Sequence, residues 1–406
     1  MRIVLGVLGV LGALVFALSP AGAQRIRPLG HVYPGGGYTG DVFVHRGFAY
    51  LSSWHGGSCP SQGVRVYDLS KASRPRRVST FANGGSDIAV RGTWTEKTIV
   101  QHAASPSFTG ELAAVSFQHC PGTNSYRGFG LYDVTNPLAP KQLSLVRTDP
   151  GGSHEIWLQT VRRRAYVYTA IPLAEFPPGP FTPGFRIYDV TDPRHPAEVG
   201  SWIAPESMRA GKLGVFVHSV RVNAAATRAY LSYWNLGTVI LDISRPSQPR
   251  FLGRTTDSQG DAHSTAITPN GRLLIETHET IGGRPSFWDI SNPRRPRLLS
   301  VFKPPARLIA DARKRGAAGF TLGVHDAKII GKRAYFSWYA LGVVVADISN
   351  PRHPRFVAQF LPPASRDPEN QFCAKQSCTY TWGVYPTLKY VAAADMVGGL
   401  WVFRAR

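Results

Sequence analysis

Four histidines stand at the start of short runs of alternating apolar residues, each directly after a small or apolar residue. Neutral imidazole is the commonest protein ligand for zinc, copper, iron and nickel. If these runs lie side by side around one axis, their rings can hold a transition metal (Cu, Fe or Zn). An open position on that metal would suit oxidative chemistry. The candidate metal ligands are His154, His218, His263 and His325.

The same histidines can instead be structural. In the run that begins at His154, the imidazole alternates in step with Ile156 and Leu158, which places it on the side of a strand that packs against a neighbour. Acidic residues follow some of the histidines or hold the matching position in other runs. They could fix the imidazole tautomers by hydrogen bonding or act as ligands, although a Ca²⁺ site would need more carboxylates. The acidic candidates are Asp41, Asp87, Glu155 and Asp326.

Aromatic residues form a second recurring set. They end the strand-like runs AYLSSW, AYLSYW and AYFSWY, where they could pack between neighbouring units. With their edges exposed, they could instead stack on a sugar or an aromatic ligand. Tyr385 joins the set because it occupies the position of the histidines in the last run. The other candidate ligand-binding residues are Trp54, Tyr233, Trp234, Trp338 and Tyr339.

An internal repeat indicates which fold positions these residues. Six segments share alternating apolar residues, an Asp, an apolar residue, Ser or Thr, and a Pro seven positions after the Asp. One strand-like run follows each segment and two precede it, so the repeat predicts four strands per unit, as in a β-propeller. The Asp is expected to accept backbone N–H bonds in the turn between the third and fourth strands. The repeat aspartates are Asp68, Asp133, Asp189, Asp242, Asp289 and Asp347.

A seventh unit is divided between the two ends of the chain. The C-terminal GLWVFRAR matches a third strand, and residues 27–32 resemble the fourth strand at 249–254. We therefore expect an all-β, seven-bladed β-propeller with four antiparallel strands per blade, forming a single domain over residues 24–406. The N-terminal strand would complete the last blade and close the ring, which leaves no open sheet edge.

The repeat unit, apolar-x-apolar-x-Asp-(Val/Ile)-(Ser/Thr)-x-Pro-x-x-Pro, resembles the LVIVD-repeat family of secreted bacterial β-propeller proteins. The resemblance extends over essentially all of residues 24–406 and implies the propeller fold. It implies no particular activity, because the function of that family is largely unknown and a fold does not fix a function.

The N-terminus has the features of a signal peptide. Arg2, an apolar run over residues 3–18 and the small-residue site at residues 21–23 predict cleavage after residue 23. An uncleaved membrane anchor is the alternative, and the shortness of the apolar run disfavours it. The protein is expected to be secreted or associated with the cell envelope, where cysteines form disulfides. The predicted pairs are Cys373–Cys378 and Cys59–Cys120.

Segments of extra length fall on one predicted face of the ring, opposite the constant turns that run from the repeat Asp to the Pro. Insertions gathered on one face of a repeat protein usually mark its binding side. Within them, residues 306–317 are predicted to form a short helix. The insertions span residues 56–62, 105–126, 172–183, 205–214, 303–322 and 362–381.

Positive charge gathers on the other face. Lys and Arg number 46 against 25 Asp and Glu, a formal net charge of +21. Many of these cations lie on the Asp-to-Pro turns, so that face could contact anionic envelope polymers or phospholipid headgroups through salt-sensitive electrostatics. No nucleic-acid-reading element accompanies the charge, so no nucleic-acid partner is expected. The residues are Lys71, Arg74, Arg76, Arg77, Lys141, Arg194, Arg245, Arg250, Arg294, Arg295, Arg297, Arg352 and Arg355.

Two function hypotheses follow from these patterns. In the first, the protein is an exported scaffold that binds an envelope-associated protein, a polysaccharide or a small ligand on the face with the insertions. In the alternative, it is an oxidase-like or oxygenase-like metalloenzyme with its metal in a four-histidine ring at the channel mouth. The sequence contains no nucleophile elbow, P-loop, dinucleotide fingerprint or His-Glu-x-x-His motif, so whether it is an enzyme stays open.

Overall fold

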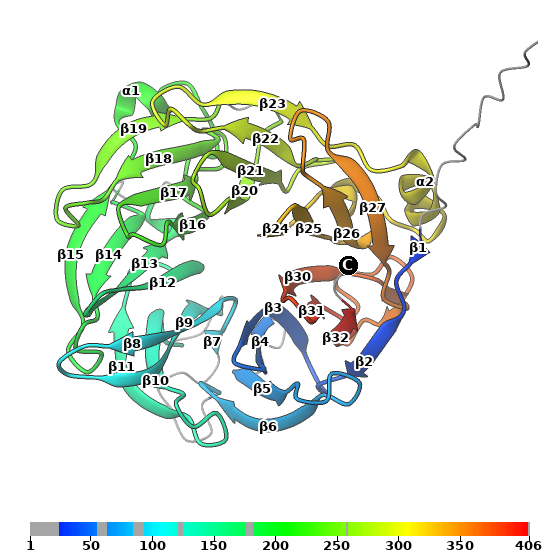
Figure 1. Ribbon diagram of the computed structural model, residues 1–406, viewed down its shortest axis with the longest axis horizontal. Helices are drawn as coiled ribbons and strands as arrows, with labels where there is room; N and C mark the ends of the chain where they lie inside the picture. Colours follow the sequence, from blue (N-terminus) through cyan, green and yellow to red (C-terminus); the bar gives the residue numbers. More distant parts are fainter. Residues whose placement is uncertain are drawn as a thin grey trace, which may run out of the picture.

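The computed structural model describes residues 24–54, 63–83, 93–120, 125–175, 182–256 and 259–404. Seven four-stranded antiparallel sheets stand around a central axis (Figure 1). The first strand of each sheet lies innermost and the fourth lies at the rim. The protein is therefore a seven-bladed β-propeller, as the repeat predicts.

The strands of blades 1 to 4 have the following bounds. Blade 1 holds β3 (Tyr38–His45), β4 (Phe48–Trp54), β5 (Val64–Asp68) and β6 (Arg76–Phe81). Blade 2 holds β8 (Thr98–Ala104), β9 (Thr109–His119), β10 (Gly128–Asp133) and β11 (Lys141–Arg147), and β7 (Thr93–Trp94) pairs with β9. Blade 3 holds β12 (Glu155–Val161), β13 (Arg164–Ala170), β14 (Phe185–Asp189) and β15 (Ala197–Trp202). Blade 4 holds β16 (Ser219–Val222), β17 (Arg228–Ser232), β18 (Thr238–Asp242) and β19 (Arg250–Arg254).

The remaining blades and the minor elements complete the ring. Blade 5 holds β20 (Ala262–Ile267), β21 (Leu273–His278), β22 (Ser286–Asp289) and β23 (Arg297–Val301). Blade 6 holds β24 (Asp326–Ile330), β25 (Arg333–Trp338), β26 (Gly342–Asp347) and β27 (Arg355–Phe360). Blade 7 holds β30 (Thr381–Pro386), β31 (Tyr390–Asp395), β32 (Gly399–Arg404) and β2 (Pro28–Val32). The minor elements are β1 (Gln24–Arg25), β28 (Ser365–Arg366), β29 (Ser377–Cys378), α1 (Glu206–Arg209), α2 (Ala306–Lys314), η2 (Pro172–Glu175) and η3 (Gly319–Leu322).

The N-terminal strand closes the ring. Strand β2 pairs antiparallel with β32, Gly30 opposite Val402, which confirms the predicted exchange between the chain ends. The imidazole of His31 stacks on Trp401 with ring centroids 3.7 Å apart, and its Nε2 lies 2.7 Å from the carbonyl oxygen of Gly398. Strand β1 then runs parallel to β27 of blade 6, so the N-terminal segment joins two blades.

The repeat Asp forms the same turn in all six repeats. Its Oδ1 accepts the backbone N–H two residues later at 2.8–3.0 Å, from Ser70 in the first repeat to Ser349 in the last. This Asx turn fixes the step from the third strand to the fourth. The structural role predicted for the repeat Asp is confirmed.

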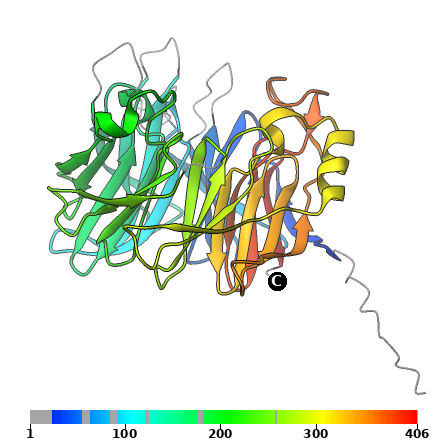
Figure 2. The same ribbon diagram turned by 90° about the horizontal axis from the view of Figure 1, so that it is seen from above.

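The two faces of the ring differ in their connections (Figure 2). The insertion face carries the loops between second and third strands and the connections between blades, including residues 172–175, 182–183, 205–214, 303–322 and 362–380. The repeat face carries the turns between first and second strands and the Asp-to-Pro turns. The predicted helix is present as α2, with Leu308 and Ala312 buried beneath it. Within the described residues, no helix has the length and apolar character needed to span a membrane.

One predicted insertion is mostly strand. Residues 105–126 were expected to form a single loop on the insertion face, but Thr109–His119 are β9, the longest strand of blade 2. Leu112 and Ala114 pack towards blade 3, whereas Ala113, Val115 and Phe117 pack towards blade 1, so the segment alternates between two buried faces as a strand does. The predicted insertion at 56–62 lies outside the described residues.

Candidate functional site

The four candidate histidines lie next to one another at the insertion-face end of the channel. His154, His218 and His325 directly precede the first strands of their blades, and His263 is the second residue of β20. The rings of consecutive blades pack with centroids 4.4 Å apart for His154 and His218 and 4.2 Å apart for the next two pairs. All four are buried. We call this set the imidazole row.

Two of these imidazoles bond across to the next blade. The Nδ1 of His218 lies 3.2 Å from the carbonyl oxygen of His263, and the Nδ1 of His263 lies 2.8 Å from that of His325. A carbonyl oxygen only accepts, so each Nδ1 carries the proton and donates it. The Nε2 of a neutral His218 or His263 is therefore a free lone pair, the form in which imidazole binds metals.

The Nε2 atoms of the row meet a carboxylate. His154 Nε2 lies 2.9 Å from His218 Nε2, and His263 Nε2 lies 3.4 Å from an oxygen of Glu279. One ligand atom each from His218, His263 and Glu279 fall within 4.8 Å of one another. The hydroxyl of Tyr339 donates to the other oxygen of Glu279 and holds it in place. A proton between the two Nε2 atoms would satisfy their contact as a hydrogen bond, and a metal ion would satisfy it as a pair of ligands.

His325 stands apart from this convergence. Its ring packs on Trp382 with centroids 4.0 Å apart. Apart from a weak approach to the backbone of Trp382, neither ring nitrogen has a hydrogen-bond partner in the described part of the chain. The structure thus brings two of the four predicted ligands, His218 and His263, together with Glu279, which sequence reasoning missed, and His154 joins them only through its contact with His218.

Burial sets the charge state of the row. It lowers the pKa of His154 to about 4 and holds the pKa values of the other three histidines well below their usual range. The imidazoles are therefore neutral at neutral pH, as metal ligation requires. Burial also raises the pKa of Glu279 to about 7. On the other side of the row, Nδ1 of His154 contacts Gln118 Oε1 at 2.7 Å and the buried Glu96 at 3.3 Å.

The acidic candidates lie one layer further along the channel and bind cations. Lys97 Nζ lies 2.6 Å from Asp41, 2.9 Å from Glu155 and 3.7 Å from Asp326. Arg221 lies 3.4 Å from Glu155 and 3.5 Å from Asp326, and Lys328 also pairs with Asp326. We call this layer the channel ion cluster. It consists of Asp41, Lys97, Glu155, Arg221, Asp326 and Lys328.

Strand geometry explains why these acids do not join the histidines. Neighbouring residues on a strand point to opposite sides, so Glu155 faces the channel axis while His154 reaches toward the next blade. Three carboxylates and three cations share the cluster, and burial makes this pairing necessary. Asp87, the remaining acidic candidate, lies outside the described residues.

Two blades differ from the predicted register. The first strand of blade 2 is β8, so Glu96 and Lys97 hold the positions of the histidine and the acid. The polar Glu-Lys pair at the start of the strand that buries Ile99 and Val100 is the signal that could have found this cluster. In blade 7 the position of the histidine is occupied by Trp382, and not by Tyr385 as predicted. The next residue, Gly383, stands where other blades have the acid, and a Cβ atom there would come within 2.1 Å of Asp41 Oδ1.

Three of the aromatic candidates surround the imidazole row. Trp54 makes an edge contact with Trp94 at 4.8 Å, Trp234 lies 5.1 Å from His218, and Tyr339 holds Glu279.

The other three aromatic candidates lie elsewhere. Tyr233 is buried and donates to Glu175, and Trp338 Nε1 donates to the carbonyl oxygen of Leu322 at 2.8 Å, so both serve packing. Tyr385 lines a cavity of about 430 Å³ on the far side of the channel ion cluster.

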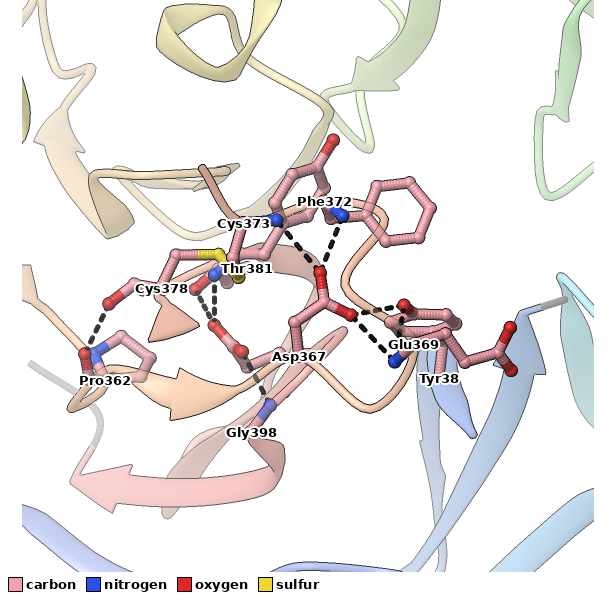
Figure 3. The surroundings of a disulfide bond; sticks show 12 residues. Tyr38, Pro362, Asp367, Glu369, Phe372, Cys373, Cys378, Thr381 and Gly398 are labelled. Carbon is pink, nitrogen blue, oxygen red and sulfur yellow. Dashed lines mark hydrogen bonds between the residues drawn. A yellow bond between two sulfur atoms is a disulfide. The ribbon is translucent and has the colours of Figure 1, made fainter. Parts of the chain in front are cut away.

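The disulfide Cys373–Cys378 is present and confirms the prediction (Figure 3). Beside it, Asp367 accepts the N–H groups of Phe372 and Cys373 at 2.6 and 2.9 Å and the hydroxyl of Tyr38. These bonds fix the loop over residues 362–380 against blade 1. Cys59 lies outside the described residues, so the Cys59–Cys120 pair stays a prediction.

Two segments, residues 228–257 and 324–361, match the LVIVD repeat family model. The chain carries LVIVD repeats. The matches cover β17 to β19 of blade 4 and the four strands of blade 6. A propeller built from such repeats is a generic interaction scaffold.

Solved structures show the same fold at low identity. Chaetomium thermophilum Raptor is 13% identical with a TM-score of 0.61, over 95% of this chain and 30% of that one. The Cps50 (Swd1) β-propeller domain of Myceliophteria thermophila is 12% identical with a TM-score of 0.59, over 94% of this chain and all of that one. The computationally designed Ika8 protein is 8% identical with a TM-score of 0.53, over 93% and 99% of the two chains. No curated protein matches the chain.

Proposed function

We propose that this propeller binds one transition-metal ion through His218 Nε2, His263 Nε2 and a carboxylate oxygen of Glu279, with His154 beside them. The observation that carries the proposal is the anchoring of His218 and His263. Each donates its Nδ1–H to a backbone carbonyl oxygen, and its neutral Nε2 faces a space shared with another imidazole and a carboxylate. Metal-binding histidines are typically held in this way.

The spacing of the ligand atoms supports the same centre. One ligand atom each from His218, His263 and Glu279 fall within 4.8 Å of one another, a space that can hold one ion. His154 Nε2 lies 2.9 Å from His218 Nε2, a hydrogen-bond distance, and is not part of this set. Two imidazoles and one carboxylate suit zinc, iron or copper, and an iron or copper ion would supply redox chemistry. The surrounding aromatic rings would keep that ion away from bulk water.

Elemental analysis of protein purified without chelators or a histidine tag tests the proposal. The wild type should hold about one equivalent of zinc, copper or iron. The His218→Ala/His263→Ala variant should lose it while keeping the circular dichroism spectrum of a folded propeller. His195→Ala is the matched control, because the His195 side chain is 82% exposed on a turn of the repeat face. A wild type that stays metal-free after incubation with each ion would contradict the proposal.

We also propose, as a second function, that the protein is exported and that its two faces bind envelope components. Every insertion in the described residues except 105–126 leaves the ring on the insertion face, which supports a protein, polysaccharide or small-ligand partner there. The cations of the Asp-to-Pro turns support contact of the repeat face with anionic polymers.

A further inference from the structure

The channel widens toward the repeat face into a cavity of about 430 Å³, which residues from all seven blades line. We call it the repeat-face cavity. The channel ion cluster forms its floor and separates it from the imidazole row. Its walls come from the first strands, where alternate residues point the same way, so that Phe43 follows Asp41 and Ile99 follows Lys97 along the channel. The volume lies within the range of small-molecule binding sites.

Three aromatic rings form part of the wall. Phe43 of blade 1 and Tyr385 of blade 7 contact each other with ring centroids 4.7 Å apart. Trp157 of blade 3 packs against the guanidinium of Arg221, which lies 5.1 Å from the centre of its ring. All three rings line the cavity and are only half-buried. They therefore offer a ligand flat apolar surfaces on which to stack.

Gln101 supplies the wall with an oriented hydrogen-bond donor. Its Oε1 accepts the backbone N–H of Thr160 at 2.8 Å and the hydroxyl of Thr160 at 3.0 Å. These two bonds fix the carbonyl end of the amide against blade 3. The NH2 end has no hydrogen-bond partner in the described part of the chain, and Gln101 lines the cavity. Two N–H donors are thus available to a ligand.

The floor carries charges of both signs in equal number. Four members of the channel ion cluster line the cavity, and the cluster as a whole balances three cations against three carboxylates. A ligand with a net charge would leave one charge unbalanced in this buried layer, which is costly. A neutral ligand with several hydroxyl groups avoids that cost, because each hydroxyl can donate to a carboxylate or accept from a cation.

We propose that the repeat-face cavity binds a neutral pyranose sugar, either free or as the terminal residue of a glycan. The apolar C–H face of the sugar ring packs on the aromatic wall. One hydroxyl accepts a hydrogen bond from the NH2 group of Gln101, and the hydroxyls nearest the floor bond to the channel ion cluster. The site depends neither on the metal centre nor on the cations of the Asp-to-Pro turns, which attract polymers by charge.

Ligand-observed NMR titration of the full chain with the methyl glycosides of glucose, galactose and mannose tests the proposal. The second and third differ from the first only in the direction of one hydroxyl group. At least one glycoside should bind saturably, with a Kd that changes less than about twofold between low and high salt, because the ligand has no net charge. D-glucuronate should bind no more tightly than the best glycoside. Tight glucuronate binding that high salt abolishes would show charge attraction instead and overturn the proposal.

Substitutions in the wall show whether the sugar occupies this cavity. Trp157→Leu removes a ring and should weaken binding about tenfold, whereas Trp157→Phe keeps a ring and should weaken it less. Gln101→Met removes the donor and should weaken binding about fivefold. Gln248→Met is the matched control, because Gln248 is exposed on a turn of the repeat face outside the lining. Circular dichroism confirms that each variant is folded.

Three results would overturn the proposal. The first is no saturable binding of any of the three glycosides to the wild type. The second is unchanged binding in both Trp157→Leu and Gln101→Met. The third is equal weakening by Gln101→Met and Gln248→Met, which would place the sugar outside the cavity. None of these results depends on the metal content of the protein.

Discussion

Removal of Lys97 should strongly destabilise the propeller, because this lysine holds the channel ion cluster together. Its side chain is 1% exposed and contacts Asp41, Glu155 and Asp326, which come from blades 1, 3 and 6. Burial alone would lower the pKa of Lys97, but these carboxylates outweigh it and hold the pKa above its usual value. Lys97→Met would leave three buried carboxylates facing only Arg221 and Lys328.

The magnitude follows from the cost of an uncompensated buried charge. Breaking a buried ion pair by removing one partner costs about 3–5 kcal/mol. An unfolding entropy of about 2.1 cal/mol/K per residue gives ~0.8 kcal/mol/K for a chain of this size, so the Tm should fall by about 5 °C. Denaturant unfolding and calorimetry at pH 7 measure both quantities. The exposed Lys332→Met is the matched control, expected to change stability by less than about 0.5 kcal/mol.

A second substitution tests whether charge imbalance is the cause. Adding Asp41→Asn to Lys97→Met restores equal numbers of buried cations and anions, so the double variant should regain at least half of the lost stability. The reasoning is refuted if Lys97→Met costs less than about 1 kcal/mol, or if Asp41→Asn destabilises the Lys97→Met background further.

Three other predictions concern the repeat, a buried acid and the basic face. Asp242→Ala removes the acceptor of the Ser244 N–H and should cost about 1 kcal/mol in denaturant unfolding, whereas Asp242→Asn keeps the acceptor and should cost less. Burial raises the pKa of Glu175 to about 7, so the folded chain holds a proton that the unfolded chain has released above about pH 4.5. The free energy of unfolding therefore falls as pH rises from about 5 to 7, and in Glu175→Gln this fall should be smaller by roughly 3 kcal/mol. Equal pH profiles of the wild type and the variant would contradict this. Cosedimentation with anionic but not zwitterionic vesicles, lost at high salt, is expected of the repeat face, and salt-independent binding would argue against it.

The fold could be predicted from the sequence because each blade repeats its own signal. The Asp-to-Pro turn recurs six times, and the strand at residues 28–32 resembles the fourth strands closely enough to show where the ring closes. Blade 2 is where this reasoning failed. Its repeat turn is regular, but β9 extends through a stretch that was predicted to be a loop. The first strand of blade 2 was therefore predicted at the wrong residues.

The site could be predicted only in part. His154, His218 and His263 were visible because they share a position in their blades. Glu279 was not, because it follows the second strand of blade 5 and reaches the row only through the packing of Tyr339. Lys97, Arg221 and Lys328 were hidden for a similar reason. A single sequence does not reveal that three separate cations meet three acids in one channel.

Anomalous diffraction from crystals of the metal-loaded protein, recorded at the absorption edge of the bound ion, tests the central claim most directly. The account predicts one strong peak about 2.0–2.2 Å from the Nε2 atoms of His218 and His263 and from an oxygen of Glu279. His325 should lie outside the coordination sphere. No peak at the row, or a peak ligated by His325 with Glu279 uninvolved, would contradict it.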